Sequence, residues 1–126
     1  MTLHSPEHTA QALDARLAAA SLQERLAIIA AEEGRAVFTT SLGIEDQVIT
    51  AAIGLAQLPI SVSTLETGRL FKQTLDLIAE TEERFGISIE RFVPKQDDID
   101  AYAAKFGLNG FYESVEARHA CCHVRK

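Results

Sequence analysis

Two adjacent cysteines near the end of the sequence are the residues best suited to redox or metal chemistry. Cys121 and Cys122 are the only cysteines among the 126 residues. Neighbouring Cα atoms lie about 3.8 Å apart across a trans peptide, whereas disulfides prefer roughly 4.4–6.8 Å. Because a bond between these two would be strained, we expect the thiols to be free, catalytic or bound to a metal.

The segment that carries these cysteines is basic. Residues 117–126 hold three arginine or lysine side chains, two histidines and no acid, whereas the remaining residues have a formal charge of -9. A positive field lowers the pKa of a thiol and favours thiolate ligands. Zinc could bind Cys and His here, but the usual C-x2-4-C spacing is absent. Iron–sulfur clusters normally take four thiolates, so two cysteines cannot complete such a site. Two free thiols in an unstructured end are the alternative.

A short polar segment, residues 40–46 (TSLGIED), could hold an anionic group. Thr40, Ser41 and Gly43 fall between a strand-like stretch and a helix-like stretch. Free N–H groups at a helix N-terminus suit an anion, and a glycine allows close approach. The segment has no GK[ST] ending, so it is not a Walker A loop. The same hydroxyls also fit a plain helix cap.

A second segment, residues 64–69 (TLETGR), has a similar position between a strand and a helix. Gly68 fits a turn, and Arg69 fits either an anion contact or a solvated surface charge. Two such loops at the same edge of one sheet could hold opposite parts of one nucleotide.

The pattern of apolar residues predicts the elements that carry these segments. Before residue 35 we expect two helices. Pro6 opens the first, and a capping box of Ser21 and Glu24 opens the second, which is expected to end near Gly34. Strands are then expected to alternate with helices. The expected strands are residues 36–40, 60–64 and 87–93, and the expected helices are 44–55, 71–85 and 99–106.

This alternation predicts an α/β fold with a parallel sheet that has helices on both faces. In such sheets ligands bind at the carboxyl ends of the strands, which selects the segments 40–46 and 64–69. We expect a single domain over residues 1–126. Within it, residues 1–34 form a helical segment and residues 35–126 form the nucleotide-binding α/β part.

The composition excludes several classes of protein. Apolar residues make up 47% and charged residues 24%, which is ordinary for a globular protein and unlike a disordered or disulfide-rich chain. A formal net charge of -6 disfavours nonspecific binding to nucleic acid or to an anionic membrane. The first residues lack the features of a secretory signal, and no apolar run reaches the roughly 18–20 residues of a membrane span. The cytoplasm is therefore the expected location.

Three stretches of the sequence together resemble the assimilatory adenylyl-sulfate and phosphoadenylyl-sulfate reductases. TSLGIEDQVI is similar to the modified phosphate loop of that family, and TLETGRLF is similar to its LDTGRLF segment. GLNGFYESVEARHACCHVRK is similar to the segment that leads into its CC-x-x-RK signature. The resemblance runs from about residue 36 to residue 126. It implies an adenine-nucleotide α-hydrolase-like fold of the PP-loop type, in agreement with the alternation of strands and helices.

The resemblance implies a reaction. In the family, a cysteine near the C-terminus attacks the sulfur of the bound phosphosulfate to form an enzyme S-sulfocysteine, and thioredoxin or a similar thiol donor then releases sulfite. Members with the cysteine pair and a later C-x-x-C bind a 4Fe–4S cluster and generally use adenylyl sulfate. Cys121 and Cys122 place this sequence with those members, on the path of sulfate assimilation toward cysteine. Members without these cysteines generally use the 3′-phosphorylated nucleotide (PAPS).

The resemblance also implies roles for individual residues. Cys121 and Cys122 would supply half of the cluster ligands, and Lys126 matches the lysine between cluster and substrate, with Arg125 as a possible assistant. The substrate-binding residues implied in this way are Thr40, Ser41, Gly43, Leu65, Thr67, Gly68, Arg69, Arg125 and Lys126.

The sequence departs from the family pattern in two places, and the first departure, at Glu66, is expected to be tolerated. Glu66 stands where the family more often has Asp, which adds a methylene to the loop. The nucleophilic cysteine and the later cysteine pair are expected downstream of Lys126, so we read the chain as an N-terminal part that is inactive by itself. Self-association into a homo-oligomer is expected from the incomplete sheet. The alternatives are a PAPS reductase and a noncatalytic nucleotide-binding or redox-sensing module.

Overall fold

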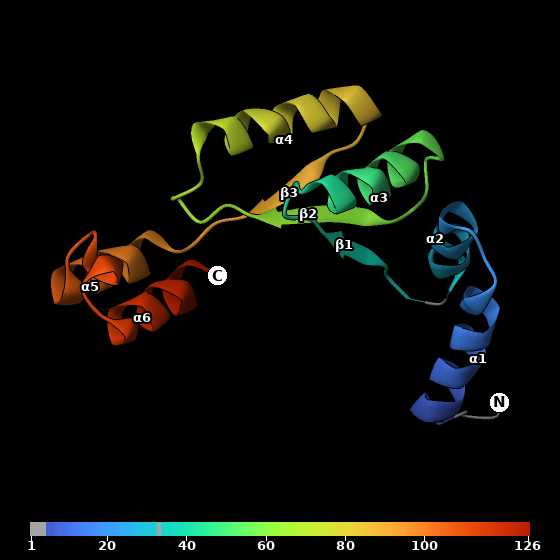
Figure 1. The fold of residues 1–126 in the computed structure, drawn as a ribbon, viewed down its shortest axis with the longest axis horizontal. Helices are drawn as coiled ribbons and strands as arrows, with labels where there is room; N and C mark the ends of the chain where they lie inside the picture. The colour runs from blue at the N-terminus through green and yellow to red at the C-terminus, as the bar shows by residue number, and fades with distance from the viewer. Residues whose placement is uncertain (1–4, 33) are drawn as a thin grey trace.

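Three short parallel strands form the centre of the computed structural model, which describes residues 5–32 and 34–126 (Figure 1). They are β1 (Val37–Thr39), β2 (Ser61–Leu65) and β3 (Ile89–Phe92), and they pair in the order β1-β2-β3. Val62 lies between Phe38 and Ile89 in the register of the sheet. The predicted α/β class, the parallel sheet and all three predicted strands are confirmed, with β3 shorter than the predicted segment 87–93.

The two helices that connect these strands lie over the same face of the sheet. They are α3 (Ile44–Leu55) and α4 (Lys72–Phe85), and Figure 1 shows both above the strands. Both crossovers step in the same direction across the sheet, so the usual right-handed connection puts both helices on one side. On the opposite face, Val37 and Phe92 are 53% and 52% exposed. No helix among the described residues covers this face next to Val37 and Phe92.

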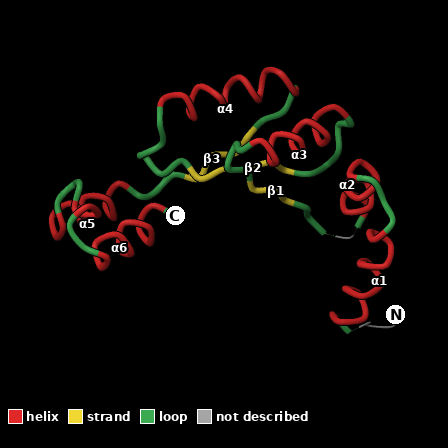
Figure 2. The backbone as a smooth tube through the Cα atoms, viewed as in Figure 1, coloured by secondary structure: helices red, strands yellow, loops and turns green. Residues whose placement is uncertain are grey.

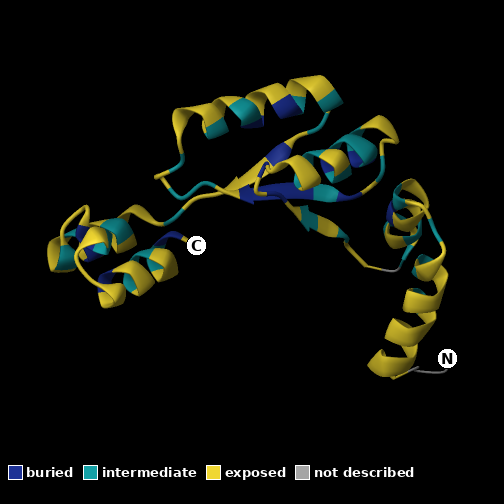
Figure 3. Ribbon diagram, viewed as in Figure 1, coloured by how far each residue is buried: buried dark blue, intermediate teal, exposed yellow. Residues whose placement is uncertain are grey.

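The core lies between the sheet and the connecting helices. Ile78 of α4 is fully buried, and Ile53 of α3 is 2% exposed. These apolar side chains pack on β2 and β3, whose buried residues appear dark blue in Figure 3. The cluster of buried residues consists of Leu26, Leu42, Ile53, Ile60, Val62, Ile78 and Ile89.

The two N-terminal helices differ in how they are held. Helix α1 (Pro6–Ala18) has Pro6 in its first turn and no buried residue among those described, whereas Leu26 of α2 (Leu22–Ala31) joins the core. The predicted capping box is present, because Glu24 and Ser21 each accept a hydrogen bond from the backbone N–H of the other. Helix α2 ends at Ala31, earlier than predicted, and Gly34 follows with a φ of +108°.

The last part of the chain forms a separate helical unit. It consists of α5 (Gln96–Phe106), the short 3-10 helix η1 (Gly110–Tyr112) and α6 (Val115–Arg125). Figures 1 and 2 show this unit beyond the carboxyl end of the sheet, joined to β3 by a single loop. Within it, Tyr102 donates a hydrogen bond of 2.9 Å to the carbonyl of Ala117. The sequence predicted α5 in part and did not predict α6, which carries the cysteines.

None of the helices in residues 5–32 and 34–126 combines the length and the apolar character needed to cross a membrane.

Candidate functional site

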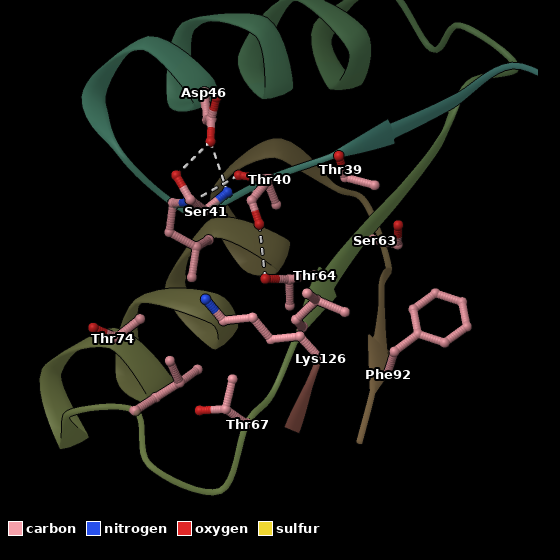
Figure 4. A pocket seen from close by; sticks show the side chains of 13 residues that line it. Thr39, Thr40, Ser41, Asp46, Ser63, Thr64, Thr67, Thr74, Phe92 and Lys126 are labelled. Carbon is pink, nitrogen blue, oxygen red and sulfur yellow. Dashed lines mark hydrogen bonds between the residues drawn. The ribbon is translucent and has the colours of Figure 1, made fainter. Parts of the chain in front are cut away.

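A pocket of about 440 Å³ opens at the carboxyl ends of β1 and β2 (Figure 4). This is the edge at which parallel sheets bind ligands. Residues from both predicted loops line it, together with Phe92 of β3 and Lys126 from the end of α6. The lining residues are Thr39, Thr40, Ser41, Leu42, Asp46, Ser63, Thr64, Leu65, Thr67, Leu70, Thr74, Phe92 and Lys126.

The strand ends that form the pocket are locked together by threonines. The amide of Thr40 donates to the carbonyl of Ser63 at 2.8 Å, and the hydroxyl of Thr64 donates to the carbonyl of Thr40 at 2.8 Å. Both threonines are 5% exposed. The Thr40 hydroxyl in turn accepts a 2.9 Å hydrogen bond from the amide of Leu42. Thr40 therefore shapes the loop as well as lining the pocket.

The left-handed residue of the first loop is a leucine, Leu42, and not the neighbouring Gly43. Leu42 has a φ of +67°, a left-handed conformation that costs a non-glycine residue free energy, and its side chain is buried in the core. Gly43 has an ordinary φ of -67° and serves as the N-cap of α3 without lining the pocket. Burial of the Leu42 side chain stabilises this backbone conformation.

Asp46, in the first turn of α3, organises the same loop. Its carboxylate accepts two hydrogen bonds from Ser41, one from the backbone amide at 2.6 Å and one from the hydroxyl at 2.7 Å (Figure 4). The backbone hydrogen bond, followed by the hydroxyl, lowers the pKa of Asp46 below its usual value. Both donors of Ser41 are thus engaged inside the loop. The sequence analysis does not predict this contact; an acid five residues after a loop serine is the signal that could have indicated it.

The second loop is closed by its own side chains. Glu66 accepts a hydrogen bond from the amide of Gly68 at 2.7 Å, and the Thr67 hydroxyl accepts one from the amide of Arg69 at 3.2 Å. Gly68 has a φ of +76°, which requires the conformational freedom of glycine. Leu65 and Thr67 line the pocket, whereas Gly68 and Arg69 do not.

The two arginines of the predicted site do not line this pocket; with Gly68 they line a second one. Arg69 donates to the carbonyl of Leu108 and to the side-chain oxygen of Asn109. Arg125 is 8% exposed and donates to the carbonyl of Thr67 at 2.7 Å. Lys126, the next residue, instead extends its amine into the pocket (Figure 4). The predicted residues in the pocket are therefore Thr40, Ser41, Leu65, Thr67 and Lys126.

The cysteine pair lies on α6, about one turn before Lys126. Cys121 is half-buried, Cys122 is exposed, and both thiols are free. Burial is the main cause that raises the pKa of Tyr102, and the neighbouring Cys121 raises it further. In the described part of the chain, no cluster of three or more Cys, His, Asp or Glu side chains could hold a metal ion. Two thiolates on one accessible helix fit half of a four-cysteine ligand set.

Comparison with known proteins identifies the family. The model of the phosphoadenosine phosphosulfate reductase domain matches residues 35–126. The chain belongs to this family.

The matched residues include the sheet, both loops, the pocket and the cysteine pair of this phosphoadenosine phosphosulfate reductase domain. The chain is 73% identical to an adenosine 5'-phosphosulfate reductase of Agrobacterium fabrum, over 100% of this chain and 49% of the relative. It is 47% identical to the enzyme of that name from Burkholderia cepacia, over 94% of this chain and 48% of the relative. The chain thus spans about half the length of these relatives. The family resemblance expected from the three sequence stretches is confirmed.

Proposed function

We propose that this chain is the nucleotide-binding part of an adenylyl-sulfate reductase, which converts adenylyl sulfate to sulfite and AMP. One observation carries the proposal: the pocket at the carboxyl ends of the strands brings both loops together with Lys126, about one helical turn from the cysteine pair. The names of the relatives, adenosine 5'-phosphosulfate reductase, support the same activity.

In the proposed reaction the pocket binds the nucleotide and holds its phosphosulfate near Lys126. A thiolate attacks the sulfur, the bond from sulfur to the phosphate oxygen breaks, and AMP leaves with that electron pair. The attacking cysteine is expected beyond Lys126, and a dithiol such as thioredoxin then releases sulfite and becomes a disulfide. The ammonium of Lys126 would stabilise the negative charge that develops on the leaving phosphate.

The charge of the pocket favours adenylyl sulfate over PAPS as the substrate. Lys126 is the one cationic side chain that lines the pocket within the described residues, and the other polar groups are hydroxyls and the carboxylate of Asp46. A 3′-phosphate adds two negative charges and would need further basic partners. A PAPS reductase remains the second candidate, to be separated by the ratio of kcat/KM for the two nucleotides.

We further propose that Cys121 and Cys122 hold half of a 4Fe–4S cluster. Such a cluster would place a fixed redox-active and electrostatic group beside Lys126. The proposal also includes a cytoplasmic location, because free thiols persist in a reducing compartment, and a homo-oligomer, because one face of the sheet is exposed.

The experiment assays a protein that carries this chain joined to a second half of the kind its relatives have. With adenylyl sulfate and thioredoxin we expect sulfite, and after anaerobic purification about four irons per subunit. Cys121→Ser and Cys122→Ser should each remove the colour of the cluster. The control His123→Ala, which leaves both cysteines in place, should not. A colourless, fully active protein would refute the cluster, and the absence of sulfite with either nucleotide would refute the reductase activity. The 126-residue chain alone should form no sulfite.

A further inference from the structure

Two arginines connect the helical unit to the second loop in opposite directions. Arg69 leaves the loop and reaches the turn between α5 and η1, where its Nη2 lies 2.5 Å from the carbonyl oxygen of Leu108 and 2.8 Å from Oδ1 of Asn109. Its guanidinium also stacks over the ring of Phe111, 4.9 Å from the centroid. A planar guanidinium that binds two oxygens and stacks on a ring is held in one orientation.

The second connection runs from the helical unit back to the loop. Nη1 of Arg125, on α6, donates to the carbonyl of Thr67 at 2.7 Å and lies close to Gly68. A β-carbon added to Gly68 would meet this Nη1 at 3.1 Å, so the loop approaches the arginine closely. Arg125 is 8% exposed, and a buried cation with a charged hydrogen bond is a strong contact.

These contacts matter because little else joins the two parts. The helical unit lies beyond the sheet and is connected to it by one loop (Figures 1 and 2). Cys121 precedes Arg125 by four residues, so both lie on one face of α6, and Lys126 follows Arg125 directly. The position of Arg125 therefore determines where the cysteine pair and the Lys126 amine lie relative to the pocket.

We propose that Arg69 and Arg125 are positioning residues that couple the second loop to the helical unit that carries the cysteines, rather than groups that bind the substrate. A ligand that orders the loop then restrains α6, and a change at the cysteines is transmitted to Thr67 and the pocket. The assignment of the bound ligand rests on the proposed function, whereas the coupling itself depends only on the contacts of the two arginines.

The experiment uses the 126-residue chain with the variants Arg69→Lys and Arg125→Lys, and Arg118→Lys as control. Arg118 is an exposed arginine of the same helix. Lysine keeps the charge but cannot reproduce the fork or the stacking. Hydrogen exchange is measured over residues 66–69 and 107–112. We call the contacts of Arg69 and Arg125 the arginine clamp, and Arg69→Lys and Arg125→Lys the clamp variants. In both clamp variants we expect exchange at least tenfold faster than in the wild type, and in the control we expect no change. Equal exchange in all three variants would overturn the coupling.

A second readout distinguishes positioning from simple stabilisation. AMP is used as the probe, and the rate of alkylation of Cys121 and Cys122 by iodoacetamide is measured with and without it. We expect AMP to slow alkylation at least threefold in the wild type and in Arg118→Lys. In the clamp variants AMP should still bind within about threefold of the wild-type affinity but should no longer protect the cysteines. Protection that persists in both variants would overturn the proposal.

A third variant keeps the test decisive if an arginine change prevents folding. Asn109→Ala removes one acceptor of Arg69 without altering a charge, and it should raise exchange over residues 66–69 by a smaller factor, about threefold. Unchanged exchange there would count against the clamp. If AMP fails to bind the wild-type chain, the proposed function loses its support, and the exchange measurements still decide the coupling.

Discussion

The sheet unit and the helical unit are stabilised in different ways. In the sheet unit, apolar side chains from three helices and the strands share one core, with Ile53 and Ile78 almost fully buried. In the helical unit, the buried side chains that the structure describes are Tyr102, Ala117 and Arg125, and two of them make polar contacts. Apart from Lys126, the pocket is therefore built on the part with the larger core, and the cysteines are carried by the part with the smaller core.

This difference bears on the proposed function, in which the pocket binds the nucleotide and α6 carries the cluster ligands. Segments with few buried apolar contacts open locally at low cost, whereas core strands open only with the whole domain. The loops around Thr40 and Thr64 are anchored to core strands, whereas α6 is held by the contact of Ala117 with Tyr102 and by that of Arg125 with Thr67. Four predictions test this comparison.

The largest expected effect follows from truncation of the sheet core. Ile78→Ala removes a fully buried side chain between α4 and the sheet, and such a change costs about 2–5 kcal/mol of unfolding free energy. Leu75→Ala on the same helix is the control, because Leu75 is 40% exposed. Urea unfolding followed by circular dichroism measures both. Equal losses for the two variants would show that α4 does not pack as described.

The second prediction concerns the amine in the pocket. In the longer protein, Lys126→Ala should reduce single-turnover S-sulfocysteine formation roughly 100- to 1000-fold, or about 2.7–4 kcal/mol, which is the usual cost of one preorganised electrostatic contact. The change in stability should stay within about 0.5 kcal/mol because Lys126 is exposed. Lys126→Arg should recover part of the rate. A rate within threefold of wild type with iron retained would contradict the role, and loss of iron together with the rate would assign Lys126 to the cluster site.

A pair of glycines compares the two units directly. A β-carbon at Gly54 would lie 2.6 Å from the carbonyl oxygen of Phe85 at the α3–α4 contact, and one at Gly110 would lie 2.7 Å from Cβ of Phe106 in the helical unit. Overpacking of this kind costs about 1–3 kcal/mol. Gly54→Ala should lower the global unfolding free energy, whereas Gly110→Ala should mainly accelerate hydrogen exchange in α5 and α6. Identical exchange patterns for the two variants would show that the units unfold together.

The smallest effect is the pH dependence of the first loop. Hydrogen bonds from Ser41 lower the pKa of Asp46 in the folded chain, so this carboxylate stabilises the fold above its unfolded pKa near 3.8. That contribution is lost as the pH falls from about 3.8 through the lower folded value. In Asp46→Asn, the dependence of stability on pH in this window should be weaker than in wild type. Thermal unfolding between pH 2 and 5 measures the difference, with Glu45→Gln as the control. Parallel curves for Asp46→Asn and wild type would exclude the contribution of Asp46.

The sequence was sufficient for the order of the elements as far as α5 and for the place of the pocket. Periodicity of apolar residues gave the three strands and the helices between them, and the rule for parallel sheets selected the loops at 40–46 and 64–69. These features depend on local pattern, which is visible in one sequence. The capping box of Ser21 and Glu24 is local in the same sense, and it is present.

The features that the sequence did not reveal depend on contacts between distant residues. The orientation of Arg69 is determined by Asn109, 40 positions away, and the burial of Arg125 depends on Thr67. The left-handed Leu42 is stabilised by core packing and has no local signal, since leucine seldom adopts this conformation. Helix α6 packs against Tyr102 through the small residue Ala117. Because its apolar stripe is short, its sequence lacks the periodic pattern that predicts a helix.

The hydroxyl-rich lining of the pocket has a consequence for the exchange of its occupant. The lining includes Thr39, Thr40, Ser41, Ser63, Thr64, Thr67 and Thr74, with Lys126 as the one cationic side chain among the described lining residues. The anion of the proposed function would be held by Lys126 and by those hydroxyls that do not already donate inside the loops, as Ser41 and Thr64 do. With few charged partners, its affinity would depend weakly on salt. Such a pocket selects its occupant by shape and by the direction of hydrogen bonds. In the proposed reaction, AMP would then leave the pocket after transfer of the sulfo group without having to break many contacts with positive charges.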